Sequence, residues 1–140
     1  MRISTTTFWK SPPLIALLLI NLLALDPTVL FKRHTLFILK KKRKPLAFCT
    51  LVKHESCSEL KSVYTLPRER GKGYASKVIK RPLRRKKGVY VVCKSSLVSF
   101  YTTKGFRPVK QSPFALRWRK RLYDTFLAIV FGEQLAILRN

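Results

Sequence analysis

The hydrophobic period of the sequence changes abruptly at a basic loop that contains two glycines, and this change constrains the fold most. Residues 59–66 carry side chains that favour a strand, and Pro67 ends the run. The loop at residues 68–73, Arg-Glu-Arg-Gly-Lys-Gly, has no apolar periodicity of its own. Beyond it, apolar side chains recur at the spacing of one helix face, at Ala75, Val78, Ile79, Pro82 and Leu83. Because an interior proline removes one hydrogen bond, this helix is expected to be kinked or to end near Arg81.

Short apolar segments flank this strand, loop and helix on both sides. Two of them, residues 35–39 and 46–52, are separated by a basic turn and predict antiparallel strands. Residues 89–93 lack polar alternation, which is typical of a strand buried on both faces. The remaining expected elements are a helix at 97–101, a strand at 106–109, a helix from Ser112 with Phe114 and Trp118 at helical spacing, and a strand at 134–138. This order predicts an α+β fold with one mixed sheet and helices on its faces.

The length of 140 residues is that of one domain, able to bury roughly 70% of its unfolded surface. Residues 1–33 are expected to form a short helical part, with Ser11 as N-cap and Asp26-Pro27 as its end. The apolar stretch at 14–25 is shorter than the roughly 20 residues that cross a bilayer. A signal peptide is the alternative, but Leu25-Asp26-Pro27 offers no small-residue cleavage site.

Charge and cysteine content narrow the classes of partner. Thirty Lys and Arg against six Asp and Glu give a formal charge of +24, which indicates an anionic partner such as nucleic acid, a membrane surface or a phosphorylated ligand. Three cysteines cannot all pair with one another, so a reducing cytoplasm fits best. Cys49, His54 and Cys57 lack the paired short spacings of structural zinc sites, and no metal is expected.

The glycine loop has the features of a phosphate site. Unsatisfied backbone N–H groups and the helix dipole meet there, and Gly71 and Gly73 allow close approach. Two familiar phosphate motifs are excluded, because Gly-x-x-x-x-Gly-Lys-Ser/Thr is absent and Ser76 stands where a dinucleotide fingerprint needs Gly or Ala. What remains is Arg-x-x-Gly-x-Gly; the alternative is that the loop is only a tight turn.

Two segments together resemble a known family. The segment Thr65-Leu66-Pro67-Arg68-Glu69-Arg70-Gly71-Lys72-Gly73-Tyr74-Ala75-Ser76 resembles the acetyl-CoA signature, Gln/Arg-x-x-Gly-x-Gly/Ala, of the GNAT acyltransferase superfamily. Further on, Ser99-Phe100-Tyr101-Thr102-Thr103-Lys104-Gly105-Phe106-Arg107-Pro108 is similar to the second signature of that family. The similarity covers about residues 34 to 110. It implies a GNAT-like fold, with a mixed, mostly antiparallel sheet that opens between strands 59–66 and 89–93.

The resemblance also implies an activity: direct transfer of the acetyl group of acetyl-CoA to an amine, without a covalent enzyme intermediate. Tyr101 would be the general acid that protonates the leaving thiolate, a role that contributes roughly 10²- to 10⁴-fold. Backbone groups of Val63 and Thr65 would bind the pantetheine arm, and the loop would hold the pyrophosphate. The implied cofactor-binding residues are Val63, Thr65, Arg68, Glu69, Arg70, Gly71, Lys72, Gly73, Tyr74 and Ala75.

The general base is less defined, because the chain has only six carboxylates. Glu59 is the candidate, with Glu55, His54 or a water as alternatives. Many family members place a Glu on the strand after the signature helix, but residues 89–93 contain none, and Lys94 stands where an Asn is frequent. Without the resemblance, Tyr101 would be a core aromatic and Glu59 a solvated carboxylate at a strand edge. The acceptor is not identified.

The basic runs support a second hypothesis. Residues 40–44, 80–87 and 117–121 hold more positive charge than one cofactor needs. The alternative function is a nucleic-acid- or ribosome-associated binding module that keeps the same fold, since neutralising phosphates does not require catalytic residues. The sequence has neither a zinc finger nor the aromatic pair of an RNA-binding strand. A membrane-surface protein is the third possibility.

Overall fold

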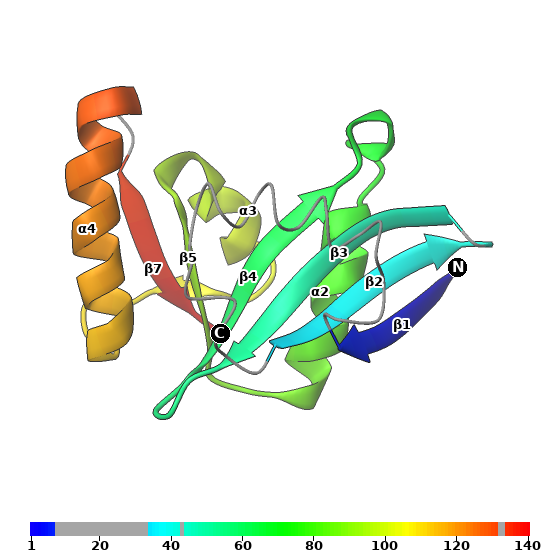
Figure 1. Ribbon diagram of the computed structural model, residues 1–140, viewed down its shortest axis with the longest axis horizontal. Helices are drawn as coiled ribbons and strands as arrows, with labels where there is room; N and C mark the ends of the chain where they lie inside the picture. Colours follow the sequence, from blue (N-terminus) through cyan, green and yellow to red (C-terminus); the bar gives the residue numbers. More distant parts are fainter. Residues whose placement is uncertain (8–33, 43, 132–133) are drawn as a thin grey trace.

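The computed structural model describes residues 1–7, 34–42, 44–131 and 134–140. Within them, seven strands form one sheet in the order β1-β2-β3-β4-β5-β7-β6 (Figure 1). The strands are β1 (Arg2–Thr7), β2 (His34–Lys41), β3 (Lys44–Lys53), β4 (Ser58–Thr65), β5 (Val89–Lys94), β6 (Arg107–Pro108) and β7 (Leu135–Arg139). Every neighbouring pair is antiparallel except β4 and β5, which are parallel. The predicted mixed, mostly antiparallel α+β fold is confirmed.

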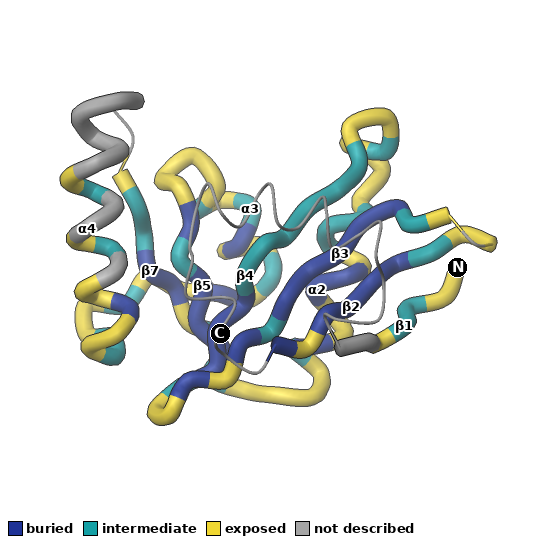
Figure 2. Tube along the Cα trace, viewed as in Figure 1, coloured by how far each residue is buried: buried dark blue, intermediate teal, exposed yellow. Residues whose placement is uncertain are grey.

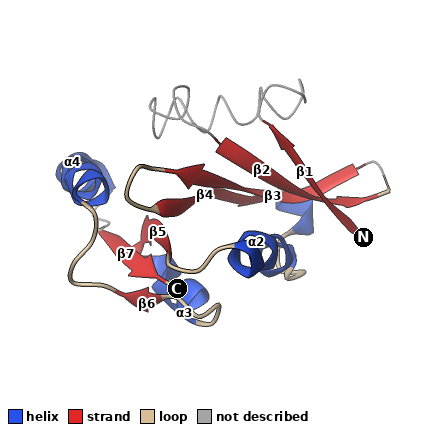
Figure 3. Ribbon diagram, turned by 90° about the horizontal axis from the view of Figure 1, so that it is seen from below, coloured by secondary structure: helices blue, strands red, loops and turns tan. Residues whose placement is uncertain are grey.

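Helices cover both faces of the sheet (Figure 3). Helices α2 (Tyr74–Arg85) and α3 (Val98–Thr102) lie on one face and α4 (Phe114–Phe131) on the other. Two short 3-10 turns, η3 (Pro67–Glu69) and η4 (Ser95–Leu97), precede α2 and α3. The main core lies between the sheet and α2, and Figure 2 shows its buried strands. Its fully buried members include Phe37, Leu60, Val78, Ile79, Phe106 and Leu138.

The prediction that residues 1–33 form a helical part is wrong at its start. Residues Arg2–Thr7 form β1, which pairs antiparallel with β2 from Arg2↔Lys40 to Thr7↔Thr35. The segment is rich in β-branched side chains, which favour a strand. Ile3 is the single apolar residue of the segment, and it packs against the core. The edge strand therefore lacks the apolar alternation by which a strand is predicted from sequence. The helix expected from Ser11 lies outside the described residues.

One of the two expectations for α2, that it ends near Arg81 because of Pro82, is wrong. The helix continues to Arg85, and Pro82 is buried within it. The amide of Lys86 donates to the carbonyl of Pro82 at 3.0 Å and closes the last turn. Packing of Val78, Ile79 and Pro82 on the sheet therefore outweighs the cost of the proline.

Helix α4 forms where the sequence predicts it, but the two aromatic side chains near its start are exposed. Phe114 is 73% exposed and Trp118 is 56% exposed. Among the side chains of α4 that the structure describes, Leu116 is buried against Tyr90 and Ile137 of the sheet. Part of the apolar face predicted for this helix is therefore on the surface.

The two central strands diverge along their length. β4 and β5 pair from Ser58↔Val89 to Leu60↔Val91, and the register ends there. β4 carries one residue more than β3 between Phe48↔Tyr64 and Thr50↔Lys61, and Ser62 within that bulge has φ of 49°. A bulge bends and twists its strand. It therefore turns the second half of β4 away from β5, as Figure 1 shows.

Candidate active site

The loop after β4 is a 3-10 turn followed by two glycines in the left-handed region. The amides of Glu69 and Arg70 donate to the carbonyls of Leu66 and Pro67 at 2.8 and 3.3 Å, so the turn itself uses them. Gly71 has φ of 78°. Gly73, the N-cap of α2, has φ of 71° and no side-chain cap. The first amides of α2 therefore open onto the loop, because a helix leaves its initial N–H groups unsatisfied.

The charged side chains of the loop interact with one another. Lys72 Nζ donates to Glu69 Oε2 at 2.9 Å and to the carbonyl of Arg68 at 3.3 Å. The hydrogen bond to Glu69 raises the pKa of Lys72. Arg70 lies 5.8 Å from the centre of the Tyr64 ring. Arg68, Arg70 and Lys72 are all exposed, so the loop is a positively charged surface in which Glu69 is already paired.

Thr65, at the end of β4, has a carbonyl that accepts a hydrogen bond and a hydroxyl that makes none with the residues that the structure describes. Its carbonyl accepts a long hydrogen bond of 3.4 Å from Arg70 Nε. Its hydroxyl is buried and has no hydrogen-bond partner in the described part of the chain. The end of the divergent half of β4 thus holds an unsatisfied buried hydroxyl and a weakly engaged carbonyl.

Tyr101 lies in the core on the side of the sheet that α2 and α3 cover. It is 5% exposed, and its ring makes edge-to-face contacts with Phe100 at 5.1 Å and Phe106 at 5.6 Å. Burial raises the pKa of Tyr101, and the nearby thiols of Cys93 and Cys49 add to the effect. The phenol therefore stays protonated at neutral pH. Tyr101 is thus a core aromatic, and its protonation state suits a proton donor.

Glu59 is buried on the opposite face. It is 1% exposed, so the expectation of a solvated carboxylate at a strand edge is wrong: β4 is in the middle of the sheet. Because neighbouring side chains on a strand alternate, Glu59 points away from the cluster that contains Leu60 and Tyr101. In the register it pairs with Tyr90 of β5, one residue before the two strands diverge.

A hydrogen bond of 2.8 Å joins the two base candidates. His54 Nε2 donates to Glu59 Oε2, and both side chains are buried. The backbone amide of His54 donates to the carbonyl of Cys57 at 2.8 Å, which closes the turn that brings the imidazole back over β4. Lys61 Nζ lies 4.0 Å from the same carboxylate oxygen. Glu55, the other carboxylate candidate, is exposed. The sequence identified His54 and Glu59 separately, and only the turn between β3 and β4 shows that they are partners.

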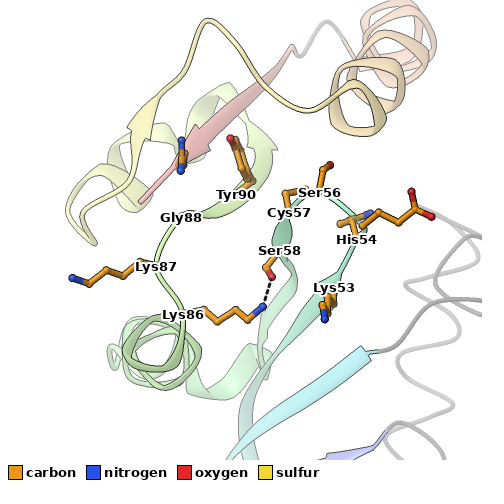
Figure 4. Close-up of a pocket in the computed structure, with 11 residues that line it drawn as sticks. Lys53, His54, Ser56, Cys57, Ser58, Lys86, Lys87, Gly88 and Tyr90 are labelled. Carbon is orange, nitrogen blue, oxygen red and sulfur yellow. Dashed lines mark hydrogen bonds between the residues drawn. The ribbon is translucent and has the colours of Figure 1, made fainter.

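A polar pocket of about 350 Å³ lies where β4 and β5 begin (Figure 4). His54, Ser58 and Tyr90 line it from the sheet side, and the loop between α2 and β5 closes it. Across the pocket, Lys86 Nζ donates to Ser58 Oγ at 3.1 Å. His54 is thus both a lining residue of the pocket and the hydrogen-bond partner of Glu59.

The described residues contain no group of three His, Cys, Asp or Glu side chains placed to hold a metal ion. Cys49 is buried and its thiol points to the carbonyl of Val78 at 3.7 Å. Burial raises the pKa of Cys49, and it raises that of Cys93 to about 11. These two thiols therefore stay neutral and act as small core side chains. Among the helices that the structure describes, none is long and apolar enough to cross a membrane.

Comparisons with known proteins agree on the fold. Escherichia coli ElaA superposes with a TM-score of 0.68 at 16% identity, covering 99% of each chain. An acyl-CoA N-acyltransferase from Pseudomonas aeruginosa gives 0.67 at 16% identity, covering 99% of this chain and 98% of that one. N-acetylglutamate synthase from Neisseria gonorrhoeae, complexed with coenzyme A and N-acetyl-glutamate, gives 0.69 at 14% identity, covering 99% of this chain and 34% of that one.

At the level of sequence, no curated protein matches the chain. A family profile does: residues 32–108 match that of the acetyltransferase (GNAT) domain. The match includes the glycine loop and Tyr101, and it spans more than half of the 140 residues. The chain belongs to the GNAT acetyltransferase family.

Proposed function

We propose that this protein is an N-acetyltransferase that moves the acetyl group of acetyl-CoA directly to an amine, with residues 1–140 forming one domain. The observation that carries the proposal is the divergence of β4 from β5 after three residue pairs. Val63 and Thr65 lie on the diverging half of β4, which leads directly into the glycine loop and α2. A long cofactor with a diphosphate at one end fits this sequence of a strand edge followed by a helix N-terminus.

The described residues suit coenzyme A. The carbonyl of Thr65 accepts a long hydrogen bond of 3.4 Å from the exposed Arg70, which an amide group of pantetheine would replace. The amides from Gly71 to Ala75 suit the pyrophosphate, since Glu69 and Arg70 already use theirs in the 3-10 turn. A Cβ added at Gly71 or Gly73 would meet no atom within 4 Å, so the backbone of the loop is open to a ligand. Arg68, Arg70 and Lys72 add positive charge, and Lys72 would exchange Glu69 for phosphate.

Two buried groups would each carry out one of the two proton transfers of the reaction. When bound, acetyl-CoA supplies the activated acyl group and a thiolate leaving group. Glu59, acting through His54 at 2.8 Å, would take the proton of the acceptor amine. Tyr101, protonated because of its burial, would give its proton to the departing sulfur. The acid and the base lie on opposite faces of the sheet, so each acts on a different side of the gap between β4 and β5.

Binding of acetyl-CoA tests the proposal. At about 100 times its dissociation constant, acetyl-CoA should stabilise the fold by about 2.7 kcal/mol, which a thermal melt detects. Gly71→Asp should abolish this shift, because its carboxylate repels the diphosphate while Asp tolerates the left-handed backbone. Gln111→Glu adds the same charge at an exposed position away from the loop and should keep the shift. The absence of a shift in the unaltered protein at low salt would refute cofactor binding.

A second candidate function, binding of single-stranded nucleic acid, is favoured by the surface of α4. The exposed rings of Phe114 and Trp118 stand one helical turn apart. Beside them is a groove of about 300 Å³ that is lined by Lys110, Arg117, Lys120 and Arg121. Exposed aromatic rings next to a cationic groove are typical of surfaces that stack bases and neutralise phosphates. Asp124 is paired with Lys120, so the groove stays positive.

Oligonucleotide titrations test this candidate. The logarithm of the binding constant should fall linearly with the logarithm of the salt concentration. Trp118→Ala should weaken binding by roughly 1–3 kcal/mol, the usual value of one stacked base. Arg68→Gln, in the glycine loop between β4 and α2, should leave oligonucleotide binding almost unchanged. Binding to anionic vesicles in preference to oligonucleotides, or equal loss in both variants, would refute a nucleic-acid surface on α4.

A further inference from the structure

We propose that the pocket at the start of β4 and β5 holds an anionic group of the acceptor, so that the acceptor is an amine that also carries a carboxylate or a phosphate. This inference rests on the proposed acetyltransferase function and adds a substrate class to it. Its basis is the composition of the pocket, the position of Arg139 and the presence of His54, the partner of Glu59, among the lining residues.

The pocket carries a strong positive charge. Four of the residues that line its volume of about 350 Å³ are cationic, and Glu55 is the single carboxylate among the lining residues. Lys86 reaches across the pocket to the hydroxyl of Ser58, as the dashed line in Figure 4 shows, while Lys87 extends away from it. An ammonium group held against a hydroxyl provides two donors at one point, which is how proteins bind a carboxylate or a phosphate.

Arg139 is held in position by the loop between α2 and β5. Its guanidinium lies 5.4 Å from the centre of the Tyr90 ring. Gly88 has φ of 67°, and a Cβ there would meet Arg139 Nη2 at 3.1 Å. The missing side chain of Gly88 therefore leaves the space that the guanidinium occupies. A planar guanidinium stacked on an aromatic ring is preorganised to bind an anion through two parallel hydrogen bonds.

The pocket is connected to the proposed base. His54 is one of its lining residues, and the imidazole of His54 donates to Glu59 at 2.8 Å. Ser58, at the pocket, is two residues from Leu60, after which β4 and β5 diverge. At the rise of a strand, this separation is about 7 Å. An acceptor anchored by its anionic group at Lys86 and Arg139 would lie beside His54, and its amine would reach Glu59 through this residue.

The same charge disfavours cationic acceptors. The protein carries +24, and four of its cationic residues line the pocket where the acceptor would enter. Polyamines and lysine-rich peptides would be repelled from this entrance, whereas anionic amines would be attracted to it. The charge of the chain therefore selects among amines as well as attracting coenzyme A.

Acceptors that differ only in the charge of their tail test the inference. Aminohexanoate, hexylamine and hexamethylenediamine share one carbon chain, with a negative, neutral or positive far end. We expect kcat/KM to be roughly 10- to 100-fold higher for aminohexanoate than for hexylamine, the usual value of a charge-assisted hydrogen bond, and lowest for the diamine. Aminopentyl phosphate, compared with aminohexanoate, distinguishes a phosphate site from a carboxylate site.

Two pocket variants and one control locate the effect. Lys86→Met and Arg139→Gln should each raise KM for aminohexanoate about 10-fold or more and leave the rate with hexylamine unchanged. Lys41→Met removes one exposed charge from the hairpin between β2 and β3, and should change neither. Equal or better use of hexylamine or the diamine would overturn the inference, as would a loss of rate with every acceptor in Lys86→Met.

Direct binding separates this inference from the proposed function. Calorimetric titration with aminohexanoate and with inorganic phosphate, in the absence of acetyl-CoA, reports the pocket alone. Binding that Lys86→Met weakens, without acetylation of any amine, would keep the anion site and refute the acetyltransferase. Acetylation of hexylamine without measurable binding of either anion would keep the acetyltransferase and refute the anion site.

Discussion

Replacing Tyr101 with Phe separates the catalytic role of this residue from its role in the core. The ring keeps its edge-to-face contacts with Phe100 and Phe106 at 5.1 and 5.6 Å, because only the hydroxyl is removed. The free energy of unfolding should therefore change by no more than about 1 kcal/mol. Turnover should fall roughly 10²- to 10⁴-fold, which corresponds to about 2.7–5.4 kcal/mol in the barrier. The kinetic effect should thus exceed the structural one.

Steady-state kinetics with acetyl-CoA and a saturating amine, together with thermal melts, measure both effects. For Tyr101→Phe we expect kcat to fall while KM for acetyl-CoA stays nearly constant, as for a group that acts in the transition state. Phe100→Leu is the matched control, since it removes the ring contact with Tyr101 but keeps the hydroxyl, at a cost of about 1–2 kcal/mol. Unchanged turnover in Tyr101→Phe would refute the general-acid role. A rise in KM at constant kcat would make Tyr101 a binding residue instead.

Three further predictions concern the base, the alkaline limit and the loop before β5. Glu59→Gln should lower kcat roughly 10²- to 10⁴-fold, whereas the exposed Glu55→Gln should leave it almost unchanged; equal effects in steady-state kinetics would contradict the assignment. Burial raises the pKa of Tyr101, and it raises the pKa of Cys93 from 9.0 to about 11. The neutral forms of both groups therefore stabilise the fold fully below pH 9, and this contribution is lost as the pH rises further. Unfolding midpoints should fall above pH 9, and they should fall less steeply in Cys93→Ala. Gly88→Ala should cost about 1–2 kcal/mol in denaturant unfolding, because of its left-handed backbone and the guanidinium beside it.

The strand, loop and helix around Gly71 and Gly73 were predictable because their determinants are local. Glycines give the positive φ that the loop needs, and the change of period shows where the strand ends and the helix begins. The second family signature places Tyr101 on the following helix in the same way. These features depend on neighbouring residues, and the structure forms them where the sequence predicts them.

The burial of Glu59 was not predictable, because it depends on contacts between distant strands. Its position in the middle of the sheet follows from pairing with β3 on one side and β5 on the other. The pairing with His54 follows from the turn that returns the chain to β4. β1 was missed for a similar reason, since Arg2–Thr7 becomes a strand by pairing with the edge of β2. A strand of this kind needs a partner more than it needs an apolar pattern.

The bulge at Ser62 determines which side chains of β4 face the core. Leu60 belongs to the core and Val63 packs against it, although side chains three apart on a regular strand point to opposite faces. The extra residue reverses the alternation between them, so Tyr64 returns to the face of Glu59 and stacks on Phe48. The same residue also bends the strand away from β5. One inserted position therefore keeps both halves of β4 packed on the core and opens the backbone edge on which the proposed cofactor would lie.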